Sequence, residues 1–325
     1  MSISEGMERG TRVKKFGLYG GLFLLMVIWG FNVIAIKLLV TEFTPIMIQS
    51  IRIFSASLVV FAVLFIAKDL RKLTRKEATY TIFGAVTGVV GHHSFLAVGL
   101  TNTSASNAGL ILGLVPLMTA LFAVLFLKDK MTLLKATGIL LALVGVSFVV
   151  LSGGGRLGSA SSGDIFVFLS VIAQAVSFIF IKKGTETMSS RLMTGWMLLA
   201  GSSTLFIIGL LIEPQGPEIL REGALGIWTI FAVSAVFATG LGHMFYNKAI
   251  YRIGPGEAAV FNNLTPFFAL LGAAIFLGEP IGWKQLIGFV LIVAGVMLGT
   301  GTVDYLMKRR ERRYASLQSY SRMKG

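Results

Sequence analysis

Three histidines stand in otherwise apolar stretches of this sequence. His92 and His93 are adjacent in GVVGHHSFLAVGL, and His243 lies in GLGHMFYNK, where Tyr246 and Asn247 follow it at three and four residues. An imidazole titrates at about pH 6.5, so it can exchange a proton or hydrogen-bond a polar solute under physiological conditions. In a helix, His243, Tyr246 and Asn247 would share one face and form a polar stripe.

Two charged side chains also lie among apolar residues. Arg52 follows Pro45 by seven residues and has no acidic residue near it in the sequence. It could snorkel toward the lipid–water interface or hold an anionic group of a solute. Glu257, in GPGEAAVFNNLTP, could stabilise a helix N-terminus or exchange a proton. His93, His243 and Glu257 are therefore the candidates for proton coupling.

Two neutral polar groups and two prolines complete the set of candidates. Trp29 and Asn32 are three residues apart, so an indole and an amide would share one face of a helix. Pro116 and Pro266 each remove a backbone hydrogen bond, which predicts bends in two apolar stretches. These bends are candidate hinges, although proline is also tolerated in membrane helices without a mechanical role.

Which elements can position these residues depends on whether the chain lies in water or in a lipid bilayer. The chain is 55% hydrophobic and only 14% charged, with a mean hydropathy of +0.81, and this composition predicts an integral membrane protein. Crossing a bilayer takes roughly 20 apolar residues in a helix, and continuous runs of that length favour helices over β-barrel strands. We expect an all-α protein with ten transmembrane helices, over residues 17–40, 45–67, 78–100, 104–127, 131–152, 164–183, 191–212, 225–248, 255–278 and 282–303.

The distribution of basic residues predicts the orientation. The net charge is +14, and 24 of the 29 lysines and arginines fall in alternate inter-helix segments or in the terminal segments. Because cytoplasmic loops carry the excess of Lys and Arg, both termini are predicted to be cytoplasmic. The basic tail is better explained by attraction to anionic lipid than by a nucleic-acid partner. The chain has no cysteine, which excludes disulfide and thiol chemistry.

The sequence contains an internal repeat. Residues 91–150 align without a gap on residues 241–300, with 13 identities in 60 positions. The matched residues include four informative pairs: His93 with His243, Pro116 with Pro266, Gly138 with Gly288, and Gly145 with Gly295. Five spans per repeat is an odd number, so the second repeat must be inverted relative to the first. These glycines could pack the helices within one chain or form a dimer face.

The repeat sets the predicted division of the chain. Inverted repeats are the arrangement expected of secondary transporters, with the substrate site at the repeat interface near the bilayer midplane. We predict a cytoplasmic segment, a first repeat, a Gly/Ser-rich linker, a second repeat and a basic cytoplasmic tail, over residues 1–16, 17–152, 153–163, 164–303 and 304–325.

Several short motifs point to a family. They are WGFNVIAIK in the first span, PIMIQSIR opening the second, and ALFAVLFLKDK ending the fourth, with its echo ALLGAAIFLGEP in the ninth. With the Gly-rich fifth and tenth spans, these residues resemble the ten-helix EamA-type group of the drug/metabolite transporter superfamily. The likeness covers residues 17–303. It implies a transporter, generally an exporter or exchanger, of small metabolites or drugs, and does not fix the substrate.

The polar residues narrow the substrate. The first span has no acidic residue, whereas the related small multidrug transporters exchange protons for cations on a glutamate there, so that mechanism does not carry over. Arg52, two histidines and one glutamate favour a neutral, zwitterionic or anionic metabolite such as an amino acid. The 25 phenylalanines leave hydrophobic drugs as the alternative.

The resulting prediction is a multi-pass exporter of the bacterial plasma membrane that works by alternating access. HExxH, P-loop and GxSxG motifs are absent, so an intramembrane enzyme is a weaker alternative, and no metal or cofactor is expected. A membrane receptor without transport activity is a further, weaker alternative. The expected partners are a small-molecule substrate and the lipid bilayer, with the protein a monomer or homodimer. The predicted substrate-binding residues are Trp29, Asn32, Arg52, His93, His243, Tyr246 and Asn247.

Overall fold

The computed structural model describes residues 3–127, 132–150, 161–253 and 261–299. All regular elements in these ranges are helical, which confirms the predicted all-α class. In the first part of the chain they are α1 (Ile3–Glu42), α2 (Pro45–Ile66), α3 (Arg75–Ala85), η1 (Val86–Gly91), α4 (His92–Thr101), α5 (Ala105–Leu112), α6 (Val115–Leu127) and α7 (Leu133–Val150). In the second part they are α8 (Ser162–Gly184), α9 (Ser190–Ile212), α10 (Gly216–Ile219), η2 (Leu220–Glu222), α11 (Leu225–Val233), η3 (Ser234–Leu241), α12 (Gly242–Ile253), α14 (Thr265–Leu277) and α15 (Trp283–Gly299).

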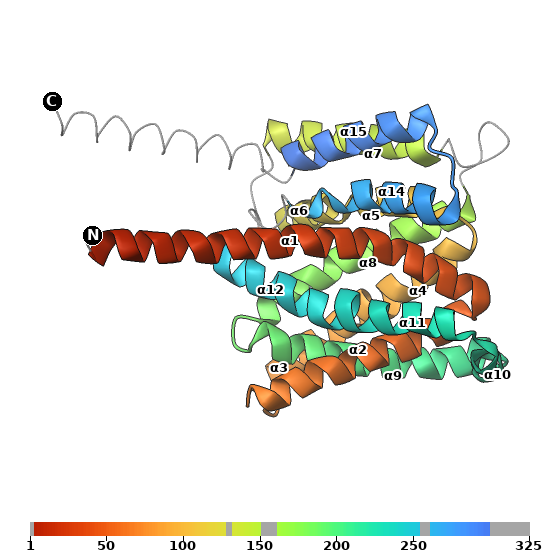
Figure 1. Ribbon diagram of the computed structural model, residues 1–325, viewed down its shortest axis with the longest axis horizontal. Helices are drawn as coiled ribbons and strands as arrows, with labels where there is room; N and C mark the ends of the chain where they lie inside the picture. The colour runs from red at the N-terminus through yellow and green to blue at the C-terminus, as the bar shows by residue number, and fades with distance from the viewer. Residues whose placement is uncertain (1–2, 128–131, 151–160, 254–260, 300–325) are drawn as a thin grey trace.

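The helices run along a common direction and form a layered bundle (Figure 1). The pair α7 and α15 lies at one side, α2, α3 and α9 lie at the opposite side, and α1 passes between them. The main helix pairs are α7 with α15, α2 with α9, α4 with α8, and α1 with α14. Each pair joins a helix from before residue 151 to one from after residue 161, so the two parts of the chain interleave.

Seven helical segments of the described residues are long and apolar enough to cross a membrane. They are Gly17–Glu42, Pro45–Ile66, Arg75–Thr101, Ala105–Phe126, Ser162–Gly184, Ser190–Ile212 and Leu225–Tyr246. The fifth, ninth and tenth predicted spans coincide with shorter apolar helices, Leu133–Val149, Thr265–Leu277 and Trp283–Gly299. The count of ten spans and the cytoplasmic placement of the termini therefore stay predictions.

Two of the predicted spans are interrupted at their prolines. A turn at residues 113–114 separates α5 from α6, and a turn at residues 263–264 precedes α14. Pro116 and Pro266 each lie in the first turn of the helix after the break, where the missing N–H would have no intrahelical partner in any case. A Cβ on Gly113 would lie 2.5 Å from Cγ of Pro266, so the two breaks touch. The hinge role of these prolines stays a prediction.

Two π-helical segments, η1 and η3, interrupt the third and eighth predicted spans. They end at Gly91 and Leu241, positions that the 150-residue offset matches, and His93 and His243 follow each at the same distance. A π-helical turn holds an extra residue, and such insertions are frequent at functional sites. The sequence pattern did not predict them.

The glycines of α7 and α15 pack against each other within one chain. A Cβ on Gly138 would lie 2.6 Å from the carbonyl oxygen of Gly295, and one on Gly145 would lie 2.9 Å from that of Gly288. This contact confirms intramolecular packing and shows what these small residues do, because only they permit such close backbone approach. Whether the protein is a monomer or a homodimer stays a prediction.

Candidate functional site

Arg52, on α2, is the centre of a buried network. Its side chain is completely buried, and its Nε and Nη2 donate to Oε1 of Gln49 over 2.9 and 2.6 Å. Its Nη1 donates to the hydroxyls of Ser234 and Thr239 on η3, over 3.1 and 2.7 Å. Its Nη2 also lies 3.4 Å from Nδ1 of His93. Snorkelling toward the interface, one of the two sequence interpretations, is therefore wrong.

Within the part of the chain that the structure describes, the charge of Arg52 has only neutral partners. Its contacts are an amide oxygen, two hydroxyls and an imidazole, and none of the described residues offers it a carboxylate. The ion pairs in the described part of the chain join Arg71 to Glu77 and Arg191 to Asp69, beyond or at the helix ends. A charge held among apolar helices is expensive and marks functional sites in membrane proteins.

The π-helical segment η3 brings α1 into the same network. Ser234 donates to Oδ1 of Asn32 over 2.5 Å, and Nε1 of Trp29 donates to the carbonyl of Ala238 over 2.9 Å. Both polar groups predicted on one face of the first span therefore contact η3. Through Ser234, the amide of Asn32 is one hydroxyl away from Arg52.

The partners of the histidines decide which ring nitrogen carries the proton in the neutral form. Arg52 can only donate, so Nδ1 of His93 must accept and the proton lies on Nε2. The Nδ1 of His243 faces the carbonyl of Thr239 at 2.9 Å and must donate, which leaves Nε2 as an acceptor. His92 likewise donates from Nδ1 to the backbone carbonyl oxygen of Ser170 on α8, over 3.0 Å. This interhelical bond agrees with the interpretation of His92 as a packing residue.

An aromatic group adjoins the network. The indole of Trp29 lies 5.3 Å from the ring of His243 and 5.1 Å from the ring of Tyr246, and Tyr246 is buried. The structure thus places together six of the seven predicted substrate-binding residues: Trp29, Asn32, Arg52, His93, His243 and Tyr246. The seventh, Asn247, belongs to α12, but its side chain lies outside the described ones. Glu257 lies outside the described residues.

Three members of the network were missed from the sequence. Gln49 precedes Arg52 by three residues on the same helix, a spacing that could have revealed it. Ser234 and Thr239 are separated from Arg52 by 182 and 187 residues, and no local pattern relates them to it.

At one end of the bundle, two carboxylates accept hydrogen bonds from the backbone N–H groups at the N-termini of neighbouring helices. Both oxygens of Glu213, which follows α9, accept from the backbone N–H groups of Ile46 and Met47 at the start of α2, over 3.0 and 2.8 Å. Glu279, which follows α14, does the same for the first two N–H groups of α5, over 2.8 and 2.9 Å. These N–H groups have no intrahelical acceptor, and a negative charge is favourable there. Glu213 and Glu279 are each followed by proline directly after an apolar helix, and this repeated Glu–Pro could have indicated their shared role from the sequence.

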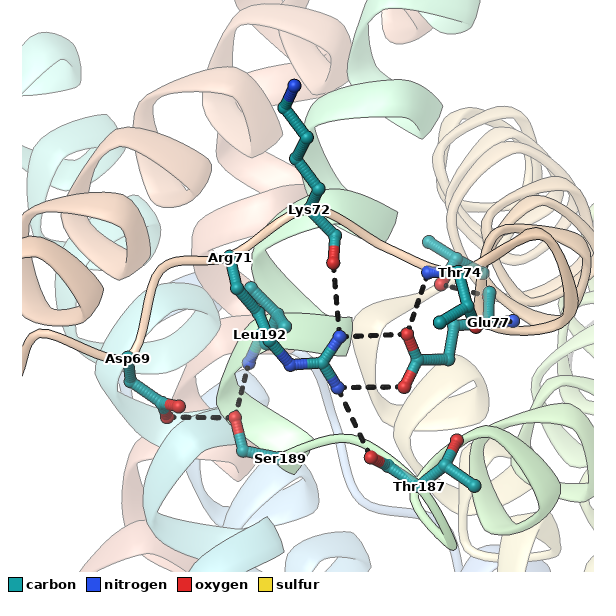
Figure 2. A network of polar contacts seen from close by, with 9 residues as sticks. Asp69, Arg71, Lys72, Thr74, Glu77, Thr187, Ser189 and Leu192 are labelled. Carbon is teal, nitrogen blue, oxygen red and sulfur yellow. Dashed lines mark hydrogen bonds and ion pairs between the residues drawn. The ribbon is translucent and has the colours of Figure 1, made fainter.

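The opposite end is fastened by a second set of charges (Figure 2). Asp69, which follows α2, accepts from the hydroxyl of Ser189 over 2.8 Å and pairs with Arg191 at 3.1 Å, both at the start of α9. Beside them, Arg71 pairs with Glu77 at 2.8 Å, and this hydrogen bond raises the pKa of the Arg71 guanidinium. The pair α2 and α9 is thus held at both ends.

A family comparison covers nearly all of these helices. The sequence profile of the EamA-like transporter family matches residues 18–151 and 161–300, nearly the whole of the described bundle. The chain belongs to this family. As a member of the EamA-like transporter family it falls within the drug/metabolite transporter superfamily that the motifs had indicated.

Individual relatives are similar over most of their length. YyaM of Bacillus subtilis strain 168, described as an uncharacterized transporter, is 30% identical over 276 residues, which are 82% of this chain and 88% of YyaM. YedA of Escherichia coli K12, an uncharacterized inner membrane transporter, is 23% identical over 283 residues, 87% of this chain and 90% of YedA. One crystal structure superposes with a TM-score of 0.65 at 16% identity, over 87% of this chain and 96% of that one, a likeness of fold.

Proposed function

We propose that this EamA-like protein is a secondary transporter that moves a small metabolite across the bacterial cell membrane by alternating access. Family membership and the transporters among its relatives support the general role. The finer statement rests on one observation: the polar network at Arg52 is buried between helices from both parts of the chain. A polar, charged cluster in the interior of an apolar bundle is where a transporter binds its substrate.

Burial of this network implies that the helices around it move. Arg52 has no exposed surface and His93 only 8%, so a solute reaches them only when α2 and α4 separate from η3. The carboxylates at both ends of α2 and α9 would hold these two helices together as one body during such a movement. The breaks before Pro116 and Pro266, which touch through Gly113, are the proposed hinges.

The proposed orientation and substrate class rest on the charges. With 24 of the 29 basic residues in alternate inter-helix segments or in the terminal segments, we orient both termini to the cytoplasm. We propose export as the physiological direction because the transporters that the sequence motifs resemble are generally exporters or exchangers. A neutral, zwitterionic or anionic metabolite such as an amino acid suits the cluster, because Arg52 is its only permanent charge among the described residues. His93 and His243, with Glu257, are the proposed coupling groups.

Counterflow in proteoliposomes tests this function. Vesicles preloaded with an unlabelled solute should accumulate the same labelled solute transiently and saturably, and the solute should be recovered chemically unchanged. Amino acids, nucleosides, sugars and cationic drugs form the panel. Selective counterflow of cationic drugs would favour the multidrug alternative, chemical conversion of the solute would indicate an enzyme, and binding without flux would indicate a receptor.

A further inference from the structure

We propose that Gln49 and Arg52 together form a subsite for a single carboxylate group of the substrate, with Gln49 as its specificity-determining residue. This inference rests on the proposed transport function and narrows it to solutes that carry a carboxylate. It is carried by two features of the described residues: a buried cation whose partners there are all neutral, and a buried amide nitrogen that finds no acceptor among them.

The orientation of the Gln49 amide is fixed by its neighbour. Guanidinium nitrogens only donate, so the atom that lies 2.6 and 2.9 Å from Nη2 and Nε of Arg52 must be the amide oxygen and not the nitrogen. The Nε2 of Gln49 is consequently turned away from the guanidinium. It is buried and, within the described residues, has no hydrogen-bond partner. Such a buried N–H group without an acceptor is costly, and a ligand oxygen would satisfy it.

The other members of the cluster add further donors. Arg52 carries only N–H groups, and His93, which lies beside Arg52, carries its proton on Nε2 in the neutral form. Donors around a lone positive charge select an acceptor with a negative charge. One cation calls for one negative charge, which a carboxylate supplies with two acceptor oxygens; an amide or an amine of the same shape supplies no charge or the wrong one.

Binding at this subsite would release η3 from α2. The hydroxyls of Ser234 and Thr239 now accept from Nη1 of Arg52, and an entering carboxylate competes for the same N–H groups. A charge-assisted bond to a carboxylate is stronger than one to a hydroxyl. Substrate binding thereby loosens the contact between two helices from different parts of the chain.

The test uses the full chain in lipid nanodiscs and three carboxylate probes with their primary amides: leucine, phenylalanine and benzoate against leucinamide, phenylalaninamide and benzamide. Ligands that bind only the folded state raise the melting temperature. We expect at least one carboxylate to raise it and its amide to leave it unchanged. Equal shifts for acid and amide, or no shift from any of the three carboxylates, would overturn the proposal.

Variants at Gln49 localise the effect. Gln49→Glu supplies the missing carboxylate from the chain itself and should remove the probe-induced shift, raising the apparent Kd at least about tenfold, while the protein stays folded. Gln49→Met removes the donor without adding a charge and should have the same effect on binding. Gln285→Glu is the matched control, a buried amide on α15 that donates to Asn107 over 2.9 Å, and it should keep the shift. Undiminished binding by both Gln49 variants would contradict the proposal.

The outcome for transport is scored separately. Counterflow of the amides but not of the acids would leave transport standing and refute the carboxylate subsite. A Gln49-dependent shift with the acids in a protein that gives no counterflow with them would support the subsite and refute the proposed transport.

Discussion

Arg52 and Arg71 each donate from both terminal nitrogens of the guanidinium, yet their surroundings differ. Arg71 lies in the loop between α2 and α3, with 45% of its side chain exposed, and holds both oxygens of Glu77 as well as the carbonyl of Thr187 (Figure 2). Arg52 lies inside the bundle and meets an amide, two hydroxyls and an imidazole. The exposed arginine is neutralised by a carboxylate of the chain, whereas the described residues supply none to the buried one.

This difference distinguishes an arginine that holds helix ends together from one whose position is typical of a functional site. A charge at a helix end is inexpensive, because water and a nearby carboxylate share its solvation, and it can fasten loops without a further role. A charge in the interior of apolar helices is costly, and pairing it with Glu or Asp would relieve that cost. Because the described residues offer Arg52 no carboxylate, we propose that an external anion occupies this position.

The largest effect is expected at Arg52. Arg52→Met removes the charge and all the guanidinium donors, and should lower the rate of counterflow by about 100-fold, since bonds to a charged group contribute up to about 3 kcal/mol. Arg52→Lys keeps the charge with fewer, differently placed donors and should recover only part of the rate. Size-exclusion chromatography establishes that both variants are folded. Near-normal counterflow of Arg52→Met would erase the distinction between the two arginines.

A smaller effect on transport is expected at Ser234, which joins Arg52 to Asn32. Ser234→Ala removes two hydroxyl bonds of about 1 kcal/mol each, together about 2 kcal/mol, and should lower counterflow roughly 30-fold. The control is Ser203→Ala, because the exposed Ser203 bonds only its own helix, at Leu199. If the two substitutions had the same effect, the link between η3, α1 and Arg52 would have no part in transport.

Glu213 should affect stability more than binding. Glu213→Ala leaves the N–H groups of Ile46 and Met47 at the start of α2 without their acceptor, at a cost of about 1 kcal/mol, as for the loss of a helix cap. The melting temperature should fall while the apparent Kd of a bound carboxylate stays unchanged. A large loss of affinity with unchanged stability would place Glu213 in the binding machinery instead.

The smallest effect is expected at Arg71. Arg71→Gln removes an ion pair in which the arginine is 45% exposed and the Glu77 carboxylate 3%, far from the Arg52 cluster, so counterflow should be unchanged. The melting temperature should fall only slightly, because water solvates the arginine side of the pair. The small shift that remains should shrink further as salt is raised from 50 to 500 mM, roughly, because exposed pairs are screened. The binding of carboxylates at Arg52 should respond less to salt than this pair does. Loss of transport in Arg71→Gln would show that the exposed arginine is also needed for transport, which contradicts the contrast with Arg52.

The fold was largely predictable because each membrane-spanning helix requires a long run of apolar residues, which is visible in the sequence. Seven predicted spans coincide with helices of spanning length, and the glycines at 138, 145, 288 and 295 pack as intramolecular contacts, one of the two alternatives their spacing allowed. The π-helical segments η1 and η3 were not predictable, since an inserted residue leaves hydrophobic periodicity in a uniformly apolar run unchanged.

The site was predictable where polar side chains are rare. Histidine, arginine and tryptophan stand out in an apolar sequence, and the structure brings Trp29, Arg52, His93 and His243 into one cluster. Ser234 was indistinguishable from the many serines that bond their own helix. Its role depends on contacts between α1, α2 and η3, which are far apart in the sequence.

The central claim is that the Arg52 cluster is a substrate site reached from both sides of the membrane. The chain has no native cysteine, so Ser234→Cys introduces a single thiol at the cluster. Labelling by a membrane-impermeant thiol reagent is measured in right-side-out and inside-out vesicles, with and without leucine, phenylalanine or benzoate. We predict labelling from both sides, slowed by the probe that raises the melting temperature. A thiol that reacts from one side only, or from neither, would contradict alternating access to this cluster.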